Sequence, residues 1–247
     1  MKAAIITGVS RGLGEALAFQ LLDKGYHVWG LSRSAPEMVH DHFRFISADF
    51  ASFRDSDFDG MWDELLEAAP KEVLLLNNAG VIDPVGAYET HRAPMIEKTL
   101  SCNVVAPMAL TAELLRRFAD KGTKLKIVNI SSGAAVHILP GLSVYSISKN
   151  ALEFATKGLV EEEKRKGRDN VSCLIVRPGI IDTKMQSDTR SLDPNEFESQ
   201  AMFSEFKESG GLRAAEDVAS DILELFFQDT SHRGLVYSLP KKLFSDL

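Results

Sequence analysis

The stretch Ala3-Ala-Ile-Ile-Thr-Gly-Val-Ser-Arg-Gly-Leu-Gly14 joins a short apolar run to a glycine-rich loop. The apolar run predicts a buried strand, and Leu13, Leu17 and Leu21 recur after it at helical spacing. Glycines let the backbone turn tightly and approach a pyrophosphate, while the N-terminus of a helix offers unpaired N–H groups and a partial positive charge. The order strand, glycine loop, helix therefore predicts a phosphate-binding site, although the spacing Gly-x-x-x-Gly-x-Gly differs from the more familiar Gly-x-Gly-x-x-Gly.

The same loop also contains Gly8-x-Ser10-x-Gly12, the pattern of the nucleophile elbow in serine hydrolases. An elbow serine normally follows several strands, because a loop after an earlier strand supplies one N–H group of the oxyanion hole. Here Ser10 follows the first predicted strand. The hydrolase interpretation is therefore kept only as a minor alternative.

Apolar runs and amphipathic segments alternate along the rest of the chain. The predicted strands cover residues 3–7, 27–31, 43–48, 73–76, 125–130, 171–176 and 234–238, and the main predicted helices cover residues 56–69, 89–121, 145–166 and 214–227, with the second helix interrupted near Asn103 and Pro107. Such alternation implies right-handed crossovers. We therefore predict an α/β fold, a doubly wound Rossmann domain whose seven-stranded sheet is mostly parallel and has helices on both faces.

The chain carries no linker or internal repeat, so we expect one domain over residues 1–247. Residues 187–211 are polar and poorly periodic, which makes them a candidate lid over the site.

Several small or polar segments directly follow predicted strands. They are the glycine loop, Asn77-Asn78-Ala79-Gly80, Ser131-Ser132 and Pro178-Gly179. Ligands of doubly wound sheets bind at the carboxyl ends of the strands. These segments are therefore expected to meet in one crevice.

The end of the second strand bears on the choice of nucleotide. A carboxylate about 20 residues after the glycine loop would bind the 2′-hydroxyl of NAD, whereas an arginine accommodates the 2′-phosphate of NADP. Here the strand ends in Ser32-Arg33-Ser34 without an acidic residue, and Arg11 lies in the loop. A guanidinium matches a phosphate by forked hydrogen bonds. The pattern favours NADP(H) as the cofactor.

Tyr145 and Lys149 are four residues apart, so on a helix they share one face. A free phenol titrates near about 10, and a neighbouring cation lowers its pKa towards the working range of a general acid or base. Ser132 precedes a Pro140-Gly141 turn that returns the chain to this site, where its hydroxyl can bond a substrate oxygen as charge develops.

The composition narrows the class of protein. The chain is 45% hydrophobic and 26% charged, with a formal net charge of −7, which is typical of a globular protein with a sizeable core. This charge argues against nucleic acid or a membrane as a partner, and we see no signal peptide or transmembrane run. Cys102 and Cys173 fit neither a disulfide framework nor a zinc site, and the six histidines lack ligand spacing. We expect a cytoplasmic protein without a metal.

Taken together, these motifs resemble the short-chain dehydrogenase/reductase family over essentially the full length. By that resemblance Tyr145 is the general acid/base, Lys149 lowers its pKa and holds the nicotinamide ribose, Ser132 orients the carbonyl, and Asn103 supports a proton relay. The resemblance also implies the following cofactor contacts: Gly8, Ser10, Arg11, Gly12, Leu13, Gly14, Ser32, Arg33, Asp49, Phe50, Asn78, Ala79, Gly80, Tyr145, Lys149, Pro178, Gly179, Ile181, Thr183 and Met185. Among these, Asp49 is similar to the adenine contact, and Ile181 and Thr183 to contacts of the nicotinamide carboxamide.

Two segments, residues 130–135 and 178–186, are similar to the sepiapterin reductase branch, which includes bacterial benzil reductases that form (S)-benzoin. Enzymes of this branch reduce one carbonyl of a vicinal diketone with NADPH. Sepiapterin reductases carry an Asp that anchors the pterin near the end of the last strand, whereas Ser238 or a neighbour stands there in this chain, which counts against pterin recognition.

The resemblance implies an NADPH-dependent carbonyl reductase that acts on a small molecule and forms a homodimer or homotetramer through its long helices. The alternatives are an NADP-dependent secondary-alcohol dehydrogenase of another substrate class, or a non-catalytic nucleotide-sensing scaffold on the same fold.

Overall fold

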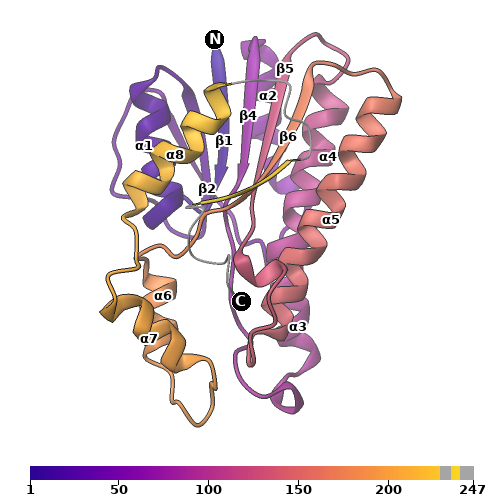
Figure 1. Cartoon of the computed structure of the whole chain (residues 1–247). Helices are drawn as coiled ribbons and strands as arrows, with labels where there is room; N and C mark the ends of the chain where they lie inside the picture. Colours follow the sequence, from indigo (N-terminus) through magenta and orange to yellow (C-terminus); the bar gives the residue numbers. More distant parts are fainter. Residues whose placement is uncertain (229–234, 240–247) are drawn as a thin grey trace.

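Seven parallel strands form the centre of the computed structural model, which describes residues 1–228 and 235–239 (Figure 1). The strands are β1 (Lys2–Thr7), β2 (His27–Ser32), β3 (Phe43–Ser47), β4 (Glu72–Asn77), β5 (Lys124–Ile130), β6 (Val171–Arg177) and β7 (Leu235–Ser238). Their order is β3-β2-β1-β4-β5-β6-β7, and every neighbouring pair is parallel. The predicted doubly wound fold is confirmed. Gly234, predicted to open the last strand, lies outside the described residues.

Helices cover both faces of the sheet (Figure 1). They are α1 (Gly12–Asp23), α2 (Asp59–Ala68), α3 (Ala93–Leu100), α4 (Ala106–Phe118), α5 (Ser143–Arg165), α6 (Lys184–Arg190), α7 (Gln200–Glu208) and α8 (Ala215–Gln228). Short 3-10 turns cover Asp55–Phe58, Tyr88–Thr90 and Gly133–Ala135. A single π-helical turn, Ser101–Val105, joins α3 to α4.

The two hydrophobic cores follow from the alternation of side chains along each strand. On β1, Ala4 and Ile6 face the core formed with α1 and α8. Their neighbours Ala3 and Ile5 face the opposite core, which includes apolar residues of α2 and α4. Because both faces are covered, the inner strands are apolar almost throughout.

The sheet changes direction between β1 and β4. From β1 the chain continues outward to β2 and β3, and it then returns to place β4 on the other side of β1. Ligands of doubly wound sheets bind in the crevice outside the carboxyl ends of the strands at such a switch point. The carboxyl ends of these strands face α3, α6 and α7 in Figure 1.

The long helix predicted over residues 89–121 differs in detail. It begins at Ala93 and ends at Phe118, and the predicted interruption near Asn103 is the π-helical turn. Pro107 does not interrupt the helix, because it lies in the first turn of α4, where a missing N–H group is tolerated.

Two other predicted boundaries shift. The helix that carries Tyr145 begins at Ser143, two residues earlier than expected, and ends at Arg165. The segment 187–211, predicted as poorly periodic, is partly helical, since it takes in the end of α6 and the whole of α7.

Within the described part of the chain, no helix combines the length and the apolar character that crossing a membrane requires. The same residues contain no group of three His, Cys, Asp or Glu side chains arranged to hold a metal ion.

Candidate active site

The loops after β1 and β4 are bonded to each other. Thr7 Oγ1 accepts hydrogen bonds from the backbone N–H groups of Asn78 and Ala79, both at 2.9 Å. The Asn78 amide in turn donates to the Thr7 carbonyl oxygen at 2.9 Å. The two segments that the sequence placed at strand ends therefore form one wall of the crevice.

The glycine loop leaves no room for side chains where it meets this wall. Gly8 and Gly12 have positive φ angles of 76° and 61°, which favour glycine. A Cβ atom on Gly14 would lie 2.2 Å from the Gly8 carbonyl oxygen. Helix α1 therefore starts directly against the loop, and Arg11 at its N-cap makes no side-chain capping bond. Bare backbone at an uncapped helix N-terminus fits the pyrophosphate of a dinucleotide.

Arg11 and Arg33 are exposed, and neither forms an ion pair with another described residue. Ser32 is buried, and its hydroxyl donates to the Ser34 carbonyl oxygen. Asp49 follows β3, and the adjacent Phe50 is buried. The charges of Arg33 and Asp49 both act on Cys102, so the ends of β2 and β3 lie on the same side as the π-helical turn.

The three predicted catalytic side chains lie together. Lys149 is buried, and its Nζ donates to the Ile130 carbonyl oxygen at 2.9 Å and lies 5.8 Å from the centre of the Tyr145 ring. The side chains of Tyr145 and Ser132 share a hydrogen bond. Helix α5 and the end of β5 thus bring a phenol, an ammonium and a hydroxyl to one place.

The pKa of Tyr145 departs from the sequence-based expectation. Burial raises the pKa of this phenol, and its hydrogen bond with Ser132 opposes the rise. Burial also lowers the pKa of Lys149 from 10.5 to about 8, with a smaller opposing effect from Cys102. The net direction is therefore opposite to the expected lowering, because removal of the phenol from water has the largest effect on its pKa.

Asn103 connects the wall of the crevice to α5. It is fully buried in the π-helical turn, where its Oδ1 accepts from the Val81 N–H and its Nδ2 donates to the Val81 carbonyl oxygen and to Ser148 Oγ. A Cβ atom on Gly80 would lie 3.4 Å from Lys149 Nζ and 3.5 Å from Asn103 Oδ1. The amide of Asn103 thus holds residue 81 close to the helix that carries Lys149.

The segment after β6 reaches the glycine loop. Thr183 is the N-cap of α6, and its methyl group would lie 3.4 Å from a Cβ atom on Gly12. Ile181 forms a bridge with Arg213, and its side chain packs against the core of α1 and α8. Met185 lies in the first turn of α6, and Pro178 and Gly179 follow β6 directly.

Sequence reasoning missed a buried ion pair beneath the site. Glu153 on α5 binds Arg177 at the end of β6 and also accepts a hydrogen bond from Ser131. One signal was available: Glu153 lies four residues after Lys149 and therefore on the same helix face.

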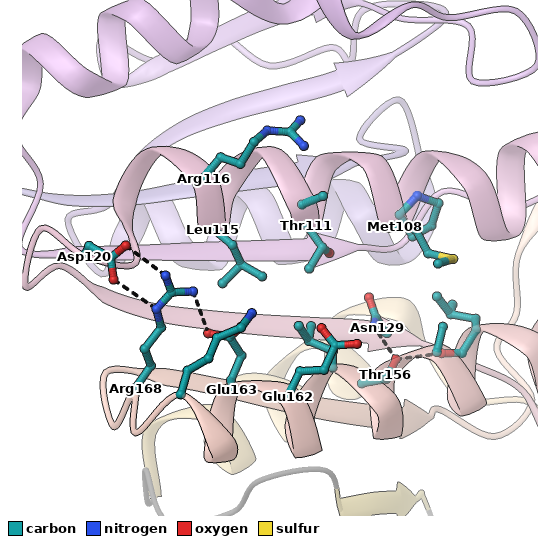
Figure 2. Close-up of a pocket in the computed structure, with 16 residues that line it drawn as sticks. Met108, Thr111, Leu115, Arg116, Asp120, Asn129, Thr156, Glu162, Glu163 and Arg168 are labelled. Carbon is teal, nitrogen blue, oxygen red and sulfur yellow. Dashed lines mark hydrogen bonds and ion pairs between the residues drawn. The ribbon is translucent and has the colours of Figure 1, made fainter.

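A separate groove of about 430 Å³ lies between α4 and α5 (Figure 2). It is lined by Pro107, Met108, Thr111, Ala112, Leu115, Arg116, Asp120, Asn129, Leu152, Ala155, Thr156, Leu159, Glu162, Glu163, Lys166 and Arg168. None of these belongs to the predicted catalytic or cofactor-binding set. Figure 2 shows Thr156 and Asn129 bonded to each other at its floor.

The model of the short chain dehydrogenase family matches residues 2–193. The chain therefore belongs to this family of oxidoreductases, whose members use nicotinamide cofactors, and the resemblance drawn from the motifs is confirmed.

Individual relatives agree with this assignment. The chain is similar to a benzil reductase ((S)-benzoin forming) of Bacillus subtilis (strain 168), with 30% identity over 247 residues that cover 98% of this chain and 100% of that protein. A solved short chain dehydrogenase/reductase from Saccharomyces cerevisiae shares 27% identity and a TM-score of 0.79, over 96% of each chain. A solved 4-hydroxyisoleucine dehydrogenase complexed with NADH shares the fold, with 23% identity, a TM-score of 0.79 and 96% of each chain covered.

The lowered pKa of Lys149 predicts how stability depends on pH. Between pH 8 and pH 10.5 the unfolded chain binds more protons at this lysine than the folded chain does, so the free energy of unfolding rises with pH. Lys149→Met lacks this dependence. We expect the variant to gain stability relative to the wild type below about pH 8, and this gain to shrink as the pH rises through the window. Urea unfolding at several pH values measures it, and a constant difference would contradict it.

Proposed function

We propose that this protein is an NADPH-dependent carbonyl reductase that reduces one carbonyl of a vicinal diketone. The proposal is carried by one observation. Ser132, Tyr145 and Lys149 lie together in a protein whose glycine loop leads into a helix without a side-chain cap at its N-terminus. The similarity to a benzil reductase over nearly the full length supports the substrate class.

The bound nicotinamide would supply the hydride, and the residues of this chain would orient the carbonyl and move the proton. Ser132 already shares a hydrogen bond with Tyr145, so a carbonyl oxygen placed between them would receive two hydroxyl donors. Tyr145 then gives its proton to the alkoxide as it forms. A raised pKa keeps Tyr145 protonated and ready for this donation at neutral pH.

Lys149 serves the same step from the other side of Tyr145. Its ammonium is fixed by the Ile130 carbonyl oxygen and faces the tyrosine ring, where it stabilises the phenolate that remains after proton transfer. Because a buried ammonium with a pKa of about 8 loses its proton easily, Lys149 is also suited to pass a proton on.

We assign the substrate lid to residues 187–211. This segment is anchored to the turn before α5, since Ser199 Oγ donates to the Pro140 carbonyl oxygen at 2.8 Å. The buried ring of Phe197 covers Gly141, where a Cβ atom would lie 2.7 Å from it. The segment thus borders the turn that leads from Ser132 to Tyr145.

The first test is oxidation of NADPH by the purified protein with benzil, followed at the nicotinamide absorbance. We expect turnover with the wild type, and a loss of at least about 10²-fold to 10⁴-fold in kcat for Tyr145→Phe, because the general acid is removed. NADPH binding by the variant should persist. Retained activity in Tyr145→Phe would contradict the assigned role.

Sepiapterin and other ketones or alcohols are run beside benzil. Little turnover of sepiapterin is expected, since Ser238 stands near the end of β7 where an anchoring Asp would be needed. Turnover of another substrate alone favours the secondary-alcohol dehydrogenase, and NADPH binding without turnover of any substrate favours the scaffold.

The choice of NADPH rests on the free guanidinium groups of Arg11 and Arg33. Replacing Arg33 with Ala removes one forked donor for the 2′-phosphate, so we expect the dissociation constant of NADPH to rise about tenfold or more while that of NADH changes little. Arg44→Ala is the control, because Arg44 is another exposed arginine and lies on the neighbouring strand β3, opposite Trp29. Equal losses for both nucleotides would count against the assignment.

We further propose that a second copy of the chain covers the face of α4 and α5. Large apolar side chains are exposed on these helices, including Met108, Ile147 and Phe154, the last of them 77% exposed, and Val105 is exposed directly before α4. Unpartnered apolar side chains of this number on two neighbouring helices are typical of an interface.

Phe154→Asp places a charge on this face and should shift the protein to monomers in light scattering after size-exclusion chromatography. Phe19→Asp, on the opposite side of the sheet on α1, is the matched control and should leave the assembly intact. An unchanged assembly in both variants would exclude this interface.

A further inference from the structure

A second polar cluster lies directly beneath the proposed catalytic residues. Glu153 is only 3% exposed and follows Lys149 by one helical turn on α5. Its Oε1 accepts hydrogen bonds from Ser131 Oγ at 2.6 Å and from Arg177 Nε at 2.8 Å. Its Oε2 accepts from Arg177 Nη2 at 2.7 Å. The arginine therefore binds the carboxylate through two parallel bonds.

Each partner of Glu153 is the chain neighbour of a proposed site residue. Ser131 precedes Ser132 at the end of β5, and Arg177 precedes Pro178 at the end of β6. The two strand ends are also paired, because the Ser131 N–H donates to the Val176 carbonyl oxygen at 2.7 Å. One carboxylate thus joins two strand ends to the helix that carries Tyr145.

We infer that Glu153 is a positioning residue, which holds Ser132 against Tyr145 by fixing the ends of β5 and β6 on α5. The inference rests on the proposed function, since it assigns Glu153 a part in the same carbonyl reduction. The hydrogen bonds and the ion pair of Glu153 go to Ser131 and Arg177, and it acts on Ser132 through them.

Stability alone does not account for this pair. Taking two charges out of water costs free energy, and replacement of a buried pair by apolar side chains is often neutral or stabilising. What the pair adds is geometry: a guanidinium and a carboxylate joined by two bonds have a fixed distance and a fixed plane. A hydrogen-bonded pair of catalytic hydroxyls at the surface of α5 needs such a fixed support, because a displacement of about 1 Å can cost 10²-fold in rate.

The contribution of Glu153 is positional and not electrostatic. Arg177 neutralises its charge through a two-bond ion pair, and burial is the largest effect on the pKa of Lys149. Loss of the carboxylate should therefore lower kcat without moving the pH profile of turnover.

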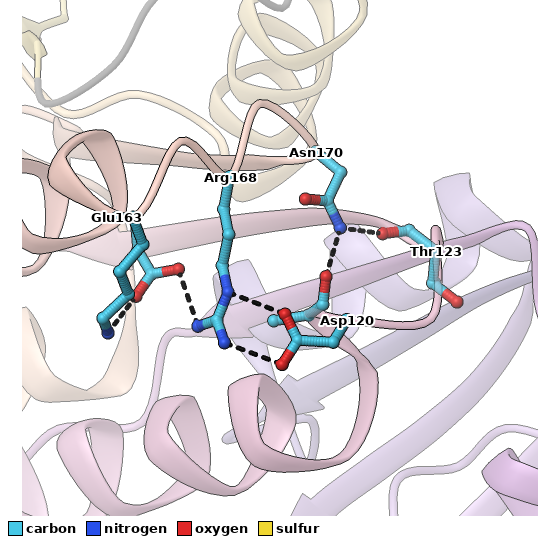
Figure 3. Close-up of polar contacts among 7 residues, drawn as sticks. Asp120, Thr123, Glu163, Arg168 and Asn170 are labelled. Carbon is cyan, nitrogen blue, oxygen red and sulfur yellow. Dashed lines mark hydrogen bonds and ion pairs between the residues drawn. The ribbon is translucent and has the colours of Figure 1, made fainter.

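The same helix provides a matched control at its other end (Figure 3). Glu163 is equally buried, and its Oε2 accepts from Arg168 Nη1 at 3.2 Å, while Arg168 also binds Asp120 through Nε and Nη2. This pair joins α5 to the turn after α4 and is remote in sequence from Tyr145. Glu163 is thus also a buried carboxylate paired with an arginine, although Arg168 binds it through one bond and Lys166 Nζ donates to its Oε1 at 2.7 Å.

The test compares Glu153→Gln with Glu163→Gln, using benzil and NADPH. We expect Glu153→Gln to lower kcat by about 10-fold to 100-fold, with the KM for NADPH within about twofold of the wild type and an unchanged pH profile. Glu163→Gln should lower the unfolding midpoint about as much as Glu153→Gln does, while its kcat stays within about twofold of that of the wild type. A normal kcat in Glu153→Gln, or equal losses in both variants, would overturn the inference.

If Glu153→Gln does not fold, Ser131→Ala tests the same inference. This variant leaves the ion pair intact and removes only the bond to the segment after β5, so a severalfold loss of kcat is expected in a variant that still folds, with a loss of stability that is limited to one hydrogen bond. An unchanged kcat would contradict the inference.

A crystal structure of Glu153→Gln, or of Ser131→Ala in its place, separates this inference from the proposed function. If the wild type turns over no carbonyl compound, the proposed function fails, yet the structure still reports whether Ser132 has left its hydrogen bond with Tyr145. An active wild type, an inactive Tyr145→Phe and an undisturbed Ser132 would reject the role of Glu153 alone.

Discussion

The hydroxyl of Thr7 joins the two strands between which the sheet changes direction. By accepting from the N–H groups of Asn78 and Ala79, it fixes the loop after β1 against the loop after β4. This contact joins two parts of the candidate site. The glycine loop lies on one side of it, and on the other side Gly80 approaches Lys149. A doubly wound sheet creates a ligand-binding crevice at this point, and the Thr7 bonds join two of the loops that border it.

Helix α5 performs a second task beyond carrying Tyr145 and Lys149. The side chain of Lys149 bonds the last residue of β5, Ile130, and those of Asn150 and Glu153 bond the segment that follows it, at Ala135 and Ser131. Three separate contacts thus hold the segment around Ser132 on one helix. The hydroxyls of the candidate site are therefore held in place by the packing and the buried polar bonds of the fold itself.

Much of this arrangement could be predicted from local sequence. The fold could be predicted because apolar runs alternate with amphipathic segments, and strands and helices each have their own spacing of apolar residues. The strand ends could be predicted because small or polar residues follow several of the apolar runs. Helix boundaries were less accurate. The π-helical turn at Ser101–Val105 depends on Asn103 bonding Val81 and Ser148, which are distant in sequence. No local pattern encodes such partners.

The sequence by itself determined the family, the order of the elements and the choice of Ser132, Tyr145 and Lys149 as candidate catalytic residues, because spacing along a helix or strand places side chains on known faces. Only the tertiary structure decided the direction of the Tyr145 pKa and the existence of the Glu153 pair with Arg177. Both depend on burial and on contacts between distant segments. The Tyr145 phenol leaves water, and the ends of β5 and β6 come together, only when the chain folds.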